Sequence, residues 1–493
     1  MKRVLSTQTM RRSDRGTIES GTSARELMRR AGEAVFHAHH WQGPVAIVCG
    51  SGNNAGDGYV LAAYLFESGI DCTVFRLFDR HSEDGGYYLV RCQQLGVAIE
   101  RYSPTVDFSA YREVVDCIFG TGFSGEADGI AADAIAAINK SGAFVLSVDI
   151  NSGLSGDNGL GTCVRSDLTV SIGYLKYGHL LGSAKDVIGQ LVNVDIGIDL
   201  YGPSAALLER EDFFGQIKTR PQNSHKGNYG YVSILGGCSA YSGAVKLAGL
   251  SCAALRAGCG VAQLIVPASL EGSVSPYLLE GTLGLLPHRN GQMVFDASAL
   301  DRCLSGQRAL AVGMGWGRSE AYPDILSHIL KHYDFSVVID ADGLNTLAQM
   351  DLQILTKTDC HVILTPHAAE MARLCKCSVG EVLGDPVGLA ERFAKTYGIT
   401  LLLKGPCTVV TDGEQTYLVN RGCAGMATAG SGDVLSGVLV GLLGYTEPTP
   451  MTVALGAYLA GRAGELAEEK VNPVSMLASD TVSMLPEAIS EMM

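Results

Sequence analysis

The sequence predicts an α/β fold in two domains, a doubly wound parallel sheet followed by a second α/β domain. Short apolar runs that are typical of strands alternate with helical stretches in both halves, and they end in loops rich in glycine and aspartate. A polar stretch over residues 199–224, with Pro203 and Pro221, separates the halves. Because 493 residues suit two or three domains, we expect domains over 1–215 and 216–493.

The composition is that of a globular protein, with 47% hydrophobic and 18% charged residues. The net charge of −14 argues against nucleic acid or an anionic membrane as a partner. The 14 cysteines show no CxxC pairs, which is typical of reduced core residues. The first residues lack the apolar stretch of a signal peptide, and the longest apolar run is far short of the ~20 residues that span a membrane. We expect a cytoplasmic protein.

The first predicted elements are a helix, a strand and a glycine turn. An amphipathic helix is expected over 17–38, with Ser23 as its cap and Glu26 three residues on. A strand over 45–49 then leads through GSGNNA to a helix from about Asp57. This arrangement predicts an anion site, and the loop fits the loose GxGxxA dinucleotide pattern.

Two further loops of the N-terminal half contain aspartates that could take part in binding or catalysis. Asp116 precedes the glycine-rich segment 120–126, and Asp149 follows another apolar run. Because the carboxyl ends of parallel strands meet at one edge, we expect these loops to converge there with the 50–57 loop, although each aspartate alone fits a turn or cap. The strands are predicted over 72–77, 113–119, 143–148 and 189–197.

In the C-terminal half, apolar strands again end in polar residues. Lys404 and the following turn suit a nucleotide phosphate, the alternative being a surface lysine at a hairpin. His367 follows a strand end, where a helix-capping histidine is as common as a functional one. A small-residue helix is expected over 241–258, and strands over 309–315, 336–345, 362–370 and 401–410.

The glycine-rich stretch Gly422–Gly437 leads into an apolar helix from about Asp433. A glycine loop at a helix start concentrates free N–H groups and suits a phosphate. A carboxylate beside that phosphate makes sense as a base for a neighbouring hydroxyl, or as an orienter of a cation. The alternative is that Asp433 only caps the helix.

The motifs GSGNNAGDG, DCIFGTGFSGE and VDINSGL, preceded by LMRRAGEAV, resemble the NAD(P)H-hydrate epimerase domain, which is Rossmann-like, over about 10–212. The resemblance implies a catalytic role for Asp149 beside the reacting ring and a potassium site at Asn54, Asp116 and Ser152. Lys176 is a candidate second polar group, an exposed lysine being the alternative. The substrate-binding residues that the resemblance implies are Asn53, Asn54, Ala55, Gly56, Asp57, Gly120, Thr121, Gly122, Phe123, Ser124, Gly125, Glu126 and Asp149.

Two residues depart from the pattern of the epimerase domain. Ala55 stands where the family usually has glycine, and Asn151 stands where it usually has proline. Alanine adds a methyl group, and asparagine is less rigid than proline. The epimerase activity is therefore predicted less securely than the activity of the C-terminal half.

The motifs SHKGNYG, GGCSAYSGA, DADGLN, TPHAAE, LLLKG and AGSGDVLSG resemble the ribokinase-like NAD(P)H-hydrate dehydratase domain over about 220–490. Together the halves resemble the bifunctional nicotinamide nucleotide repair enzymes of bacteria, which implies a homo-oligomer. The family motif after TPH ends in Gly-Glu, whereas this chain has Ala369-Glu370. The resemblance places the hydrated substrate near Ala244, Gly315, His367 and the catalytic Asp433, and ADP on Lys404, Gly405, Pro406, Cys407, Thr408 and Gly432.

A ribokinase-like site can activate the hydroxyl of hydrated NAD(P)H by phosphoryl transfer from ADP with Mg²⁺, with Asp433 as the base. The products would be NADH and NADPH, and the N-terminal domain would interconvert the R and S hydrates. Three alternatives stay open. They are a ribokinase-class small-molecule kinase fused to a dinucleotide-binding domain, a non-catalytic nucleotide sensor, and a dehydrogenase.

Overall fold

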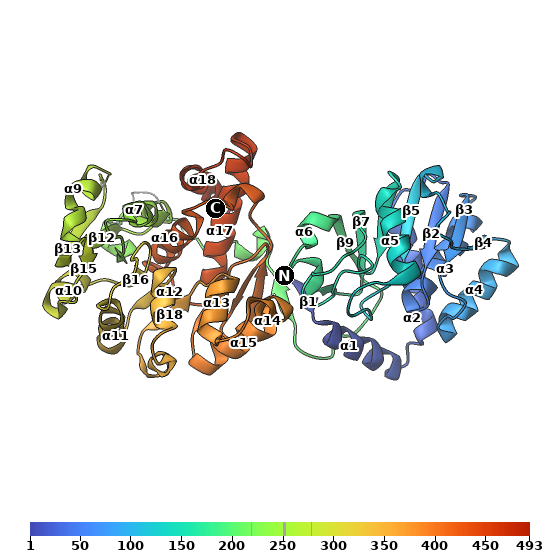
Figure 1. The fold of residues 1–493 in the computed structure, drawn as a ribbon, viewed down its shortest axis with the longest axis horizontal. Coiled ribbons are helices and arrows are strands. Elements are labelled where there is room, and N and C mark those ends of the chain that lie inside the picture. Colours follow the sequence, from blue (N-terminus) through green and yellow to red (C-terminus); the bar gives the residue numbers. More distant parts are fainter. Residues whose placement is uncertain (218, 250–252, 278) are drawn as a thin grey trace. The chain divides into compact units, whose positions relative to one another are not determined.

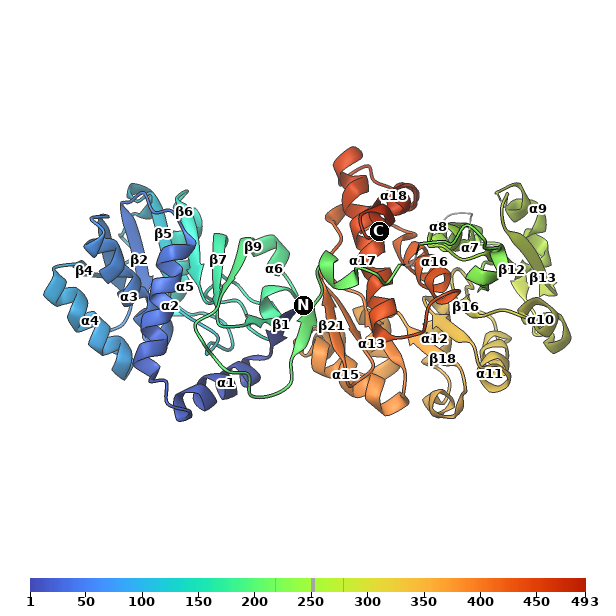
Figure 2. The same cartoon turned by 180° about the vertical axis from the view of Figure 1, so that it is seen from behind.

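The computed structural model describes residues 1–217, 219–249, 253–277 and 279–493. The chain divides into two compact units, residues 2–205 and residues 206–493, and Met1 groups with the second. Figure 1 and Figure 2 show both units from opposite sides. Among the described residues, no helix has the length and apolar character needed to cross a bilayer.

The N-terminal unit is built on a sheet with strand order β4-β3-β2-β5-β6-β7-β9, in which every neighbouring pair is parallel. This confirms the predicted doubly wound parallel sheet. The strands are β2 (Val45–Cys49), β3 (Cys72–Arg76), β4 (Ala98–Arg101), β5 (Glu113–Cys117), β6 (Phe144–Val148), β7 (Ser166–Ile172) and β9 (Ile188–Val194), and a separate parallel pair joins β1 (Lys2–Leu5) to β8 (Leu175–Lys176).

Helices cover both faces of this sheet (Figures 1 and 2). Alternate residues of each strand belong to two separate apolar clusters, so Ile47 packs with the helices of one face and Val48 with the opposite face. The first face carries α2 (Ala24–Ala38), α3 (Asn53–Glu67) and α4 (Glu83–Leu95), and the second carries α5 (Gly129–Lys140). The helix α1 (Thr7–Glu19) adds Met10 to the cluster of the first face, and α6 (Ala184–Val187) adds Ala184 to a separate small cluster.

The amphipathic helix predicted within 17–38 is α2, α1 was not predicted, and α3 begins at Asn53 rather than near Asp57. Ser23 caps α2 by accepting a hydrogen bond from the Glu26 amide, as predicted. Gly56 lies inside α3, where a Cβ atom would come within 2.4 Å of the Met28 sulfur. The glycines in this motif therefore also serve close helix packing.

The C-terminal unit has a mixed sheet with order β13-β12-β11-β16-β17-β18-β19-β20-β21-β10. The pairs from β13 to β19 are parallel, whereas β20 runs antiparallel to both neighbours. The run predicted over 401–410 thus forms two strands. The strands are β10 (Ala205–Leu207), β11 (Tyr231–Leu235), β12 (Val261–Pro267), β13 (Thr282–Leu286), β16 (Ala309–Val312), β17 (Ser336–Ile339), β18 (His361–Leu364), β19 (Thr400–Leu403), β20 (Thr408–Thr411) and β21 (Thr416–Val419), with a small hairpin of β14 (His288–Arg289) and β15 (Gln292–Met293).

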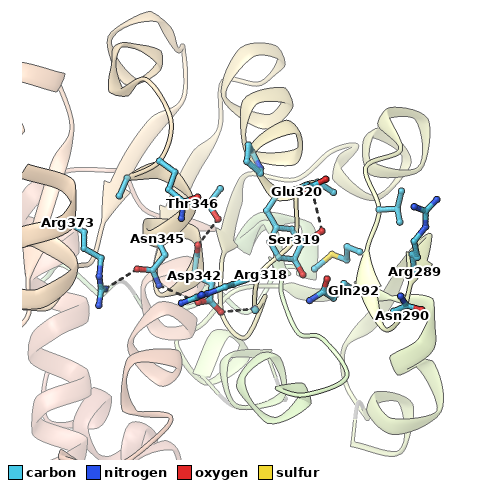
Figure 3. A pocket seen from close by; sticks show the side chains of 18 residues that line it. Arg289, Asn290, Gln292, Arg318, Ser319, Glu320, Asp342, Asn345, Thr346 and Arg373 are labelled. Carbon is cyan, nitrogen blue, oxygen red and sulfur yellow. Dashed lines mark hydrogen bonds between the residues drawn. The ribbon is translucent and has the colours of Figure 1, made fainter. Parts of the chain in front are cut away.

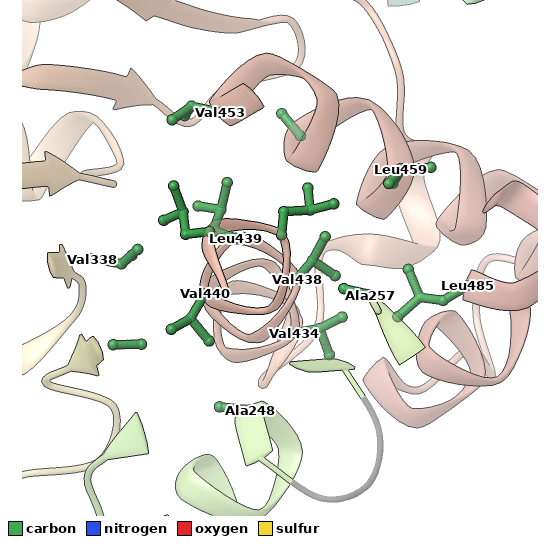
Figure 4. Packing of buried hydrophobic residues seen from close by; sticks show 14 of the residues in the cluster. Ala248, Ala257, Val338, Val434, Val438, Leu439, Val440, Val453, Leu459 and Leu485 are labelled. Carbon is green, nitrogen blue, oxygen red and sulfur yellow. The ribbon is translucent and has the colours of Figure 1, made fainter. Parts of the chain in front are cut away.

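The helix α16 (Ser431–Leu443) runs through the core of this unit (Figure 4). Val434, Val438 and Leu439 are at most 1% exposed and contact side chains from α7, α17 and α18. The structure describes the small-residue helix predicted over 241–258 as α7 and α8, and residues 250–252 lie outside the described part. The helices are α7 (Ser242–Gly249), α8 (Ala253–Arg256), α9 (Glu271–Val274), α10 (Ala297–Leu304), α11 (Tyr322–His332), α12 (Asp342–Leu347), α13 (Ala368–Cys375), α14 (Val379–Gly384), α15 (Pro386–Tyr397), α17 (Pro450–Lys470) and α18 (Ala478–Ser490).

Candidate active sites

A cavity of about 690 Å³ lies at the carboxyl edge of the N-terminal sheet. It brings together the three loops that the sequence singled out, after β2, β5 and β6. The predicted residues that line it are Asn53, Asn54, Asp57, Gly120, Thr121, Gly122, Phe123, Ser124 and Asp149. Ala55 and Gly56 are buried beneath it, and Gly125 and Glu126 do not line it.

Asp149 is the charged centre of this cavity. Its carboxylate accepts hydrogen bonds from the Lys176 ammonium at 2.5 Å and from the Thr121 amide at 3.1 Å. Lys176 is fully buried and does not line the cavity, so the exposed-lysine alternative is wrong. Burial raises the pKa of Asp149, but Lys176 and the Thr121 amide outweigh it, and the net pKa is lowered. The carboxylate is therefore ionised at neutral pH.

The backbone around Asp149 is specialised as well. Its φ of 68° lies in the left-handed region, which is costly for a residue with a side chain. A Cβ atom on Gly120 would come within 3.0 Å of the Asp149 carboxylate, which explains the glycine there. The ring of His179 accepts from the Lys176 amide at 3.0 Å and lies 2.8 Å from the Asp149 carbonyl oxygen. Burial and Lys176 lower the pKa of His179 to about 3, so the ring is neutral and donates to that carbonyl.

Two further carboxyl groups, Asp57 and Asp14, line the same cavity. Burial and the neighbouring Asp149 raise the pKa of Asp57 well above its usual value. The same two causes raise the pKa of Asp14 to about 6. The cavity therefore holds a carboxylate with a lowered pKa beside carboxyl groups with raised pKa values, which is an arrangement suited to acid–base chemistry. Asp14 was missed by the sequence analysis because α1 was not predicted.

Asp116 and Ser152 lie directly beneath this cavity. The Asp116 carboxylate accepts from the Ser152 amide at 2.8 Å and from the Ser152 hydroxyl at 2.5 Å, and it is fully buried. Asn54 donates its amide to the Phe119 carbonyl oxygen at 2.9 Å. Its own oxygen is buried and has no hydrogen-bond partner among the described residues. Ser152 also donates to the Phe119 carbonyl oxygen, at 3.2 Å, so the three residues predicted for potassium are linked through that carbonyl and the Ser152 hydroxyl, and Asn54 keeps a buried oxygen that needs a partner.

Asn151 does not make the site less rigid, contrary to expectation. Its amide group donates toward the Val164 carbonyl at 2.9 Å and the Val187 carbonyl at 3.1 Å. Its oxygen accepts from the Thr169 hydroxyl at 2.6 Å, and the side chain is fully buried. Hydrogen bonds therefore fix this position in the way that a proline ring would fix it by covalent geometry.

In the C-terminal unit, the charged centre is a lysine among carboxylates. The Lys404 ammonium lies 2.8 Å from Asp340 and 3.8 Å from Glu370. Lys404 and Asp340 follow the strands β19 and β17, and Glu370 lies in the first turn of α13, which follows β18. Burial lowers the pKa of Lys404, but the two carboxylates outweigh it and raise the pKa overall. Lys404 is only 22% exposed, so the surface-lysine alternative is wrong. Sequence analysis singled out neither Asp340 nor the Ser436 hydroxyl that donates to it at 2.9 Å.

Asp433 lies in the first turn of α16, three residues after Gly430. Gly430 is the N-cap, with a φ of 97° and no side-chain bond, so the capping alternative for Asp433 is wrong. Burial and the neighbouring Asp340 raise the pKa of Asp433 to about 7, although Lys404 opposes the shift. A Cβ atom on Gly432 would lie 3.6 Å from the Lys404 ammonium. An uncapped helix start, a lysine and a carboxyl group with a pKa near neutral thus meet here.

His367 is the N-cap of α13, so its capping role is confirmed. Its Nδ1 accepts from the amides of Ala369 at 3.1 Å and Glu370 at 3.4 Å, while Glu370 accepts from the His367 amide at 2.9 Å. His367 also pairs with Lys404 in a parallel β-bridge. The ring is 52% exposed, so a ligand beside Lys404 can reach it.

Gly315 and Ala244, which were predicted to bind the substrate, contact each other. Gly315 has a φ of 63°, and a Cβ atom there would come within 2.9 Å of the Ala244 methyl group. The nearby amide of Gly317 donates to Asp342 at 2.8 Å, and the charge of Asp342 contributes to the raised pKa of Asp433. Asp342 thus connects Gly315 and Ala244 with the charged cluster. Cys407 is buried, and Gly405 and Pro406 are exposed in the turn before β20.

Comparisons with known proteins agree for both units. Residues 232–487 match the NAD(P)H-hydrate dehydratase family, and residues 24–178 match the YjeF-related protein N-terminus family. The bifunctional NAD(P)H-hydrate repair enzyme Nnr of Moorella thermoacetica is 36% identical, over 93% of this chain and 91% of its own length.

Solved structures resemble the C-terminal unit. An ADP/ATP-dependent NAD(P)H-hydrate dehydratase from Bacillus subtilis, co-crystallised with ATP and Mg²⁺, is 27% identical with a TM-score of 0.50, covering 58% of this chain and 98% of that one. A ribokinase-like superfamily protein from Enterococcus faecalis is 24% identical with a TM-score of 0.51, covering 60% and 98%. The C-terminal fold is ribokinase-like, and the chain belongs to the family of bifunctional NAD(P)H-hydrate repair enzymes.

Proposed function

We propose that this protein repairs hydrated NADH and NADPH, with an ADP-dependent dehydratase in residues 216–493 and an epimerase of the R and S hydrates in residues 1–215. The main support for dehydratase activity is the environment of Asp433. This residue lies in the first turn of an uncapped helix beside Lys404, and its pKa is raised to about 7. A general base works best when its pKa is near the working pH.

In the dehydratase, the free amides at the start of α16 and the Lys404 ammonium hold the terminal phosphate of ADP. Asp433 accepts the proton of the substrate hydroxyl while the hydroxyl oxygen attacks that phosphorus atom, releasing AMP. Inorganic phosphate then leaves the ring carbon, and a ring proton is lost, which restores the reduced nicotinamide. Of the remaining predicted nucleotide contacts, Gly405–Thr408 follow Lys404 directly in the chain, and a Cβ atom on Gly432 would lie 3.6 Å from its ammonium.

Magnesium fits the donor set of this site. Among the described residues no three His, Cys, Asp or Glu side chains are grouped to hold a metal by themselves, so the nucleotide phosphates would supply most of the ligands, together with a carboxylate such as Asp433. Carboxylate oxygens together with nucleotide phosphates are the usual ligands of Mg²⁺. The ion would neutralise the phosphate charge when it is bound.

In the epimerase, Asp149 and Asp57 take opposite roles in one cavity. Asp57, whose raised pKa favours its protonated form, can protonate the ring hydroxyl so that it leaves as water, and Asp149 can take the proton from a water that adds to the other face. Both carboxyl groups line the cavity, whereas Lys176 does not and acts by positioning Asp149.

Potassium fits the buried oxygens below that cavity. The unpartnered oxygen of Asn54, the Asp116 carboxylate and the Ser152 hydroxyl are hard donors of the kind that such an ion prefers. We propose that these three residues hold K⁺, which would counter the charge of the substrate phosphates.

Potassium should stabilise the wild-type protein, because a ligand that binds only the folded state raises its stability. At tenfold excess over the dissociation constant the gain is about 1.4 kcal/mol, measurable as a raised melting temperature in KCl compared with NaCl. Asn54→Ala should lose the gain. Asn193→Ala is the control, because Asn193 also donates its amide to one backbone carbonyl, at 3.0 Å from Gly173. Equal melting temperatures of the wild type in the two salts would contradict the site.

The proposed function is tested by supplying chemically hydrated NADH or NADPH with ADP and Mg²⁺ and following the reduced-nicotinamide absorbance. We expect the absorbance to recover only when the nucleotide is present. If the absorbance recovered neither with ADP nor with ATP, the proposed dehydratase activity would be refuted. Recovery without any nucleotide would instead exclude phosphoryl transfer.

A further inference from the structure

A large cavity of about 1360 Å³ in the C-terminal unit carries an unusual group of charges. Three arginines line it, Arg289 from β14, Arg318 from the loop after β16, and Arg373 from α13. Within the described residues, none of these guanidinium groups forms an ion pair, and Arg373 donates only to the neutral Asn345, at 3.0 Å. Glu320 and Asp342 also line the cavity, so its lining has three arginines against two carboxylates, and in a chain of net charge −14 this local excess of positive charge suits an anionic ligand.

The loop that carries Arg318 adds an independent indication. Between β16 and α11 the chain has three glycines in the left-handed region, Gly313, Gly315 and Gly317. The N-cap of α11, Ala321, makes no side-chain hydrogen bond, and the first turn of this helix lines the cavity. A strand, a glycine loop and a helix start form a recurrent binding site for phosphate groups, although here Pro323 has no N–H to donate and Asp324 adds a carboxylate to the first turn.

The cavity extends away from the proposed reaction centre. In Figure 3, Arg318 lies between Arg373 on one side and Arg289 on the other. Asp342 lines the same cavity and lies two residues after Asp340, which accepts a hydrogen bond from Lys404 at 2.8 Å, and Arg373 shares α13 with Glu370. A ligand whose reacting group lies at Asp433 therefore has room to place its phosphates along the arginines. The cavity volume also suits a dinucleotide-sized ligand.

We propose that Arg289, Arg318 and Arg373 bind the phosphate groups of the dinucleotide hydrate, and that NADPH hydrate gains more from them than NADH hydrate because of its additional phosphate. This inference rests on the proposed dehydratase. The phosphates of ADP bind instead at Lys404 and the start of α16, so ADP and the dinucleotide hydrate place their phosphates at separate sites.

The test uses the full-length protein with single substitutions Arg289→Gln, Arg318→Gln and Arg373→Gln. Arg302→Gln is the matched control, because Arg302 is an exposed arginine of the same unit, on α10, that does not line the cavity. KM is measured for NADPH hydrate, NADH hydrate and ADP separately. Loss of a charge-assisted hydrogen bond should raise KM for NADPH hydrate by about 10- to 100-fold, and less for NADH hydrate, with kcat and the KM for ADP little changed.

The outcomes separate the two proposals. If the wild type restores NADH but all three variants keep its KM for both hydrates, the arginine assignment is wrong and the dehydratase stands. A rise in KM for ADP alone would indicate that the cavity binds the nucleotide, and it would also refute the assignment of the three arginines to the hydrate. Binding of NADPH itself, followed by its fluorescence, provides a readout without turnover, and unchanged affinity in the three variants would count against the proposal.

Discussion

Substitution of Asp433 by asparagine is expected to lower the rate of ADP-dependent dehydration by about 100- to 10,000-fold, the usual contribution of a general base. Nucleotide affinity should be retained, because the helix start and Lys404 are unchanged. For the wild type, kcat/KM should fall as the pH drops below about 7, since protonated Asp433 cannot accept the hydroxyl proton. The measurement is recovery of the reduced-nicotinamide absorbance over a pH series.

The control for folding follows from the same pKa. Asp433 has a higher pKa in the folded protein than in the unfolded chain, so its ionised form costs stability above pH 4, and in full above about pH 7. Asp433→Asn should therefore melt at a higher temperature than the wild type at pH 8 and at the same temperature near pH 4. The control variant Asp480→Asn removes a carboxylate from the first turn of α18, and it should catalyse ADP-dependent dehydration at the wild-type rate. Full activity of Asp433→Asn would remove this residue from the mechanism.

Removal of Asp149 should abolish enzymatic epimerisation, leaving interconversion of the hydrates at the spontaneous rate. Asp149→Asn alone would leave the Lys176 ammonium buried without its partner, which costs about 3–5 kcal/mol. The double variant Asp149→Asn with Lys176→Met removes both charges and avoids that cost. With ADP and Mg²⁺, this variant should consume the S hydrate of a mixed pool quickly and the R hydrate only slowly.

The comparison needs a variant with an intact site. Asp107→Asn removes an exposed carboxylate of the same unit that lies outside the cavity, and it should consume the whole pool as the wild type does. The initial rate on pure S hydrate reports the dehydratase in each variant. If the double variant consumed the entire pool at the wild-type rate, Asp149 would have no part in epimerisation.

The strands and the loops at their ends could be predicted because their signals are local. Val45–Cys49 was predicted to the residue, and the loops after β2, β5 and β6 line one cavity as expected. The predicted start of α3, near Asp57, was four residues too late, since the helix begins at Asn53. The reason is that Gly56 and Gly58 suggest a loop locally, whereas in the fold they allow α3 to pack against Met28 and Cys117.

The parts that sequence could not reveal depend on contacts between distant segments. The helix α1 lacks an apolar stripe and is held by buried hydroxyls, because Ser13 and Thr17 accept hydrogen bonds from the amides of Tyr201 and Asp199. Periodicity cannot detect a helix of this kind, so Asp14 was missed. Asp340 and Lys176 look like ordinary polar residues until the fold buries them beside a partner.

The hydrogen bonds of Asn151 mean that its replacement by the proline usual in the family would not be a neutral exchange. Proline has no side-chain amide, so the Val164 and Val187 carbonyls and the Thr169 hydroxyl would each lose a buried partner. Relatives with proline must satisfy these groups differently or lack them. The acceptable residue at position 151 therefore depends on what three other segments of the same chain already contain, and the position can change only together with them.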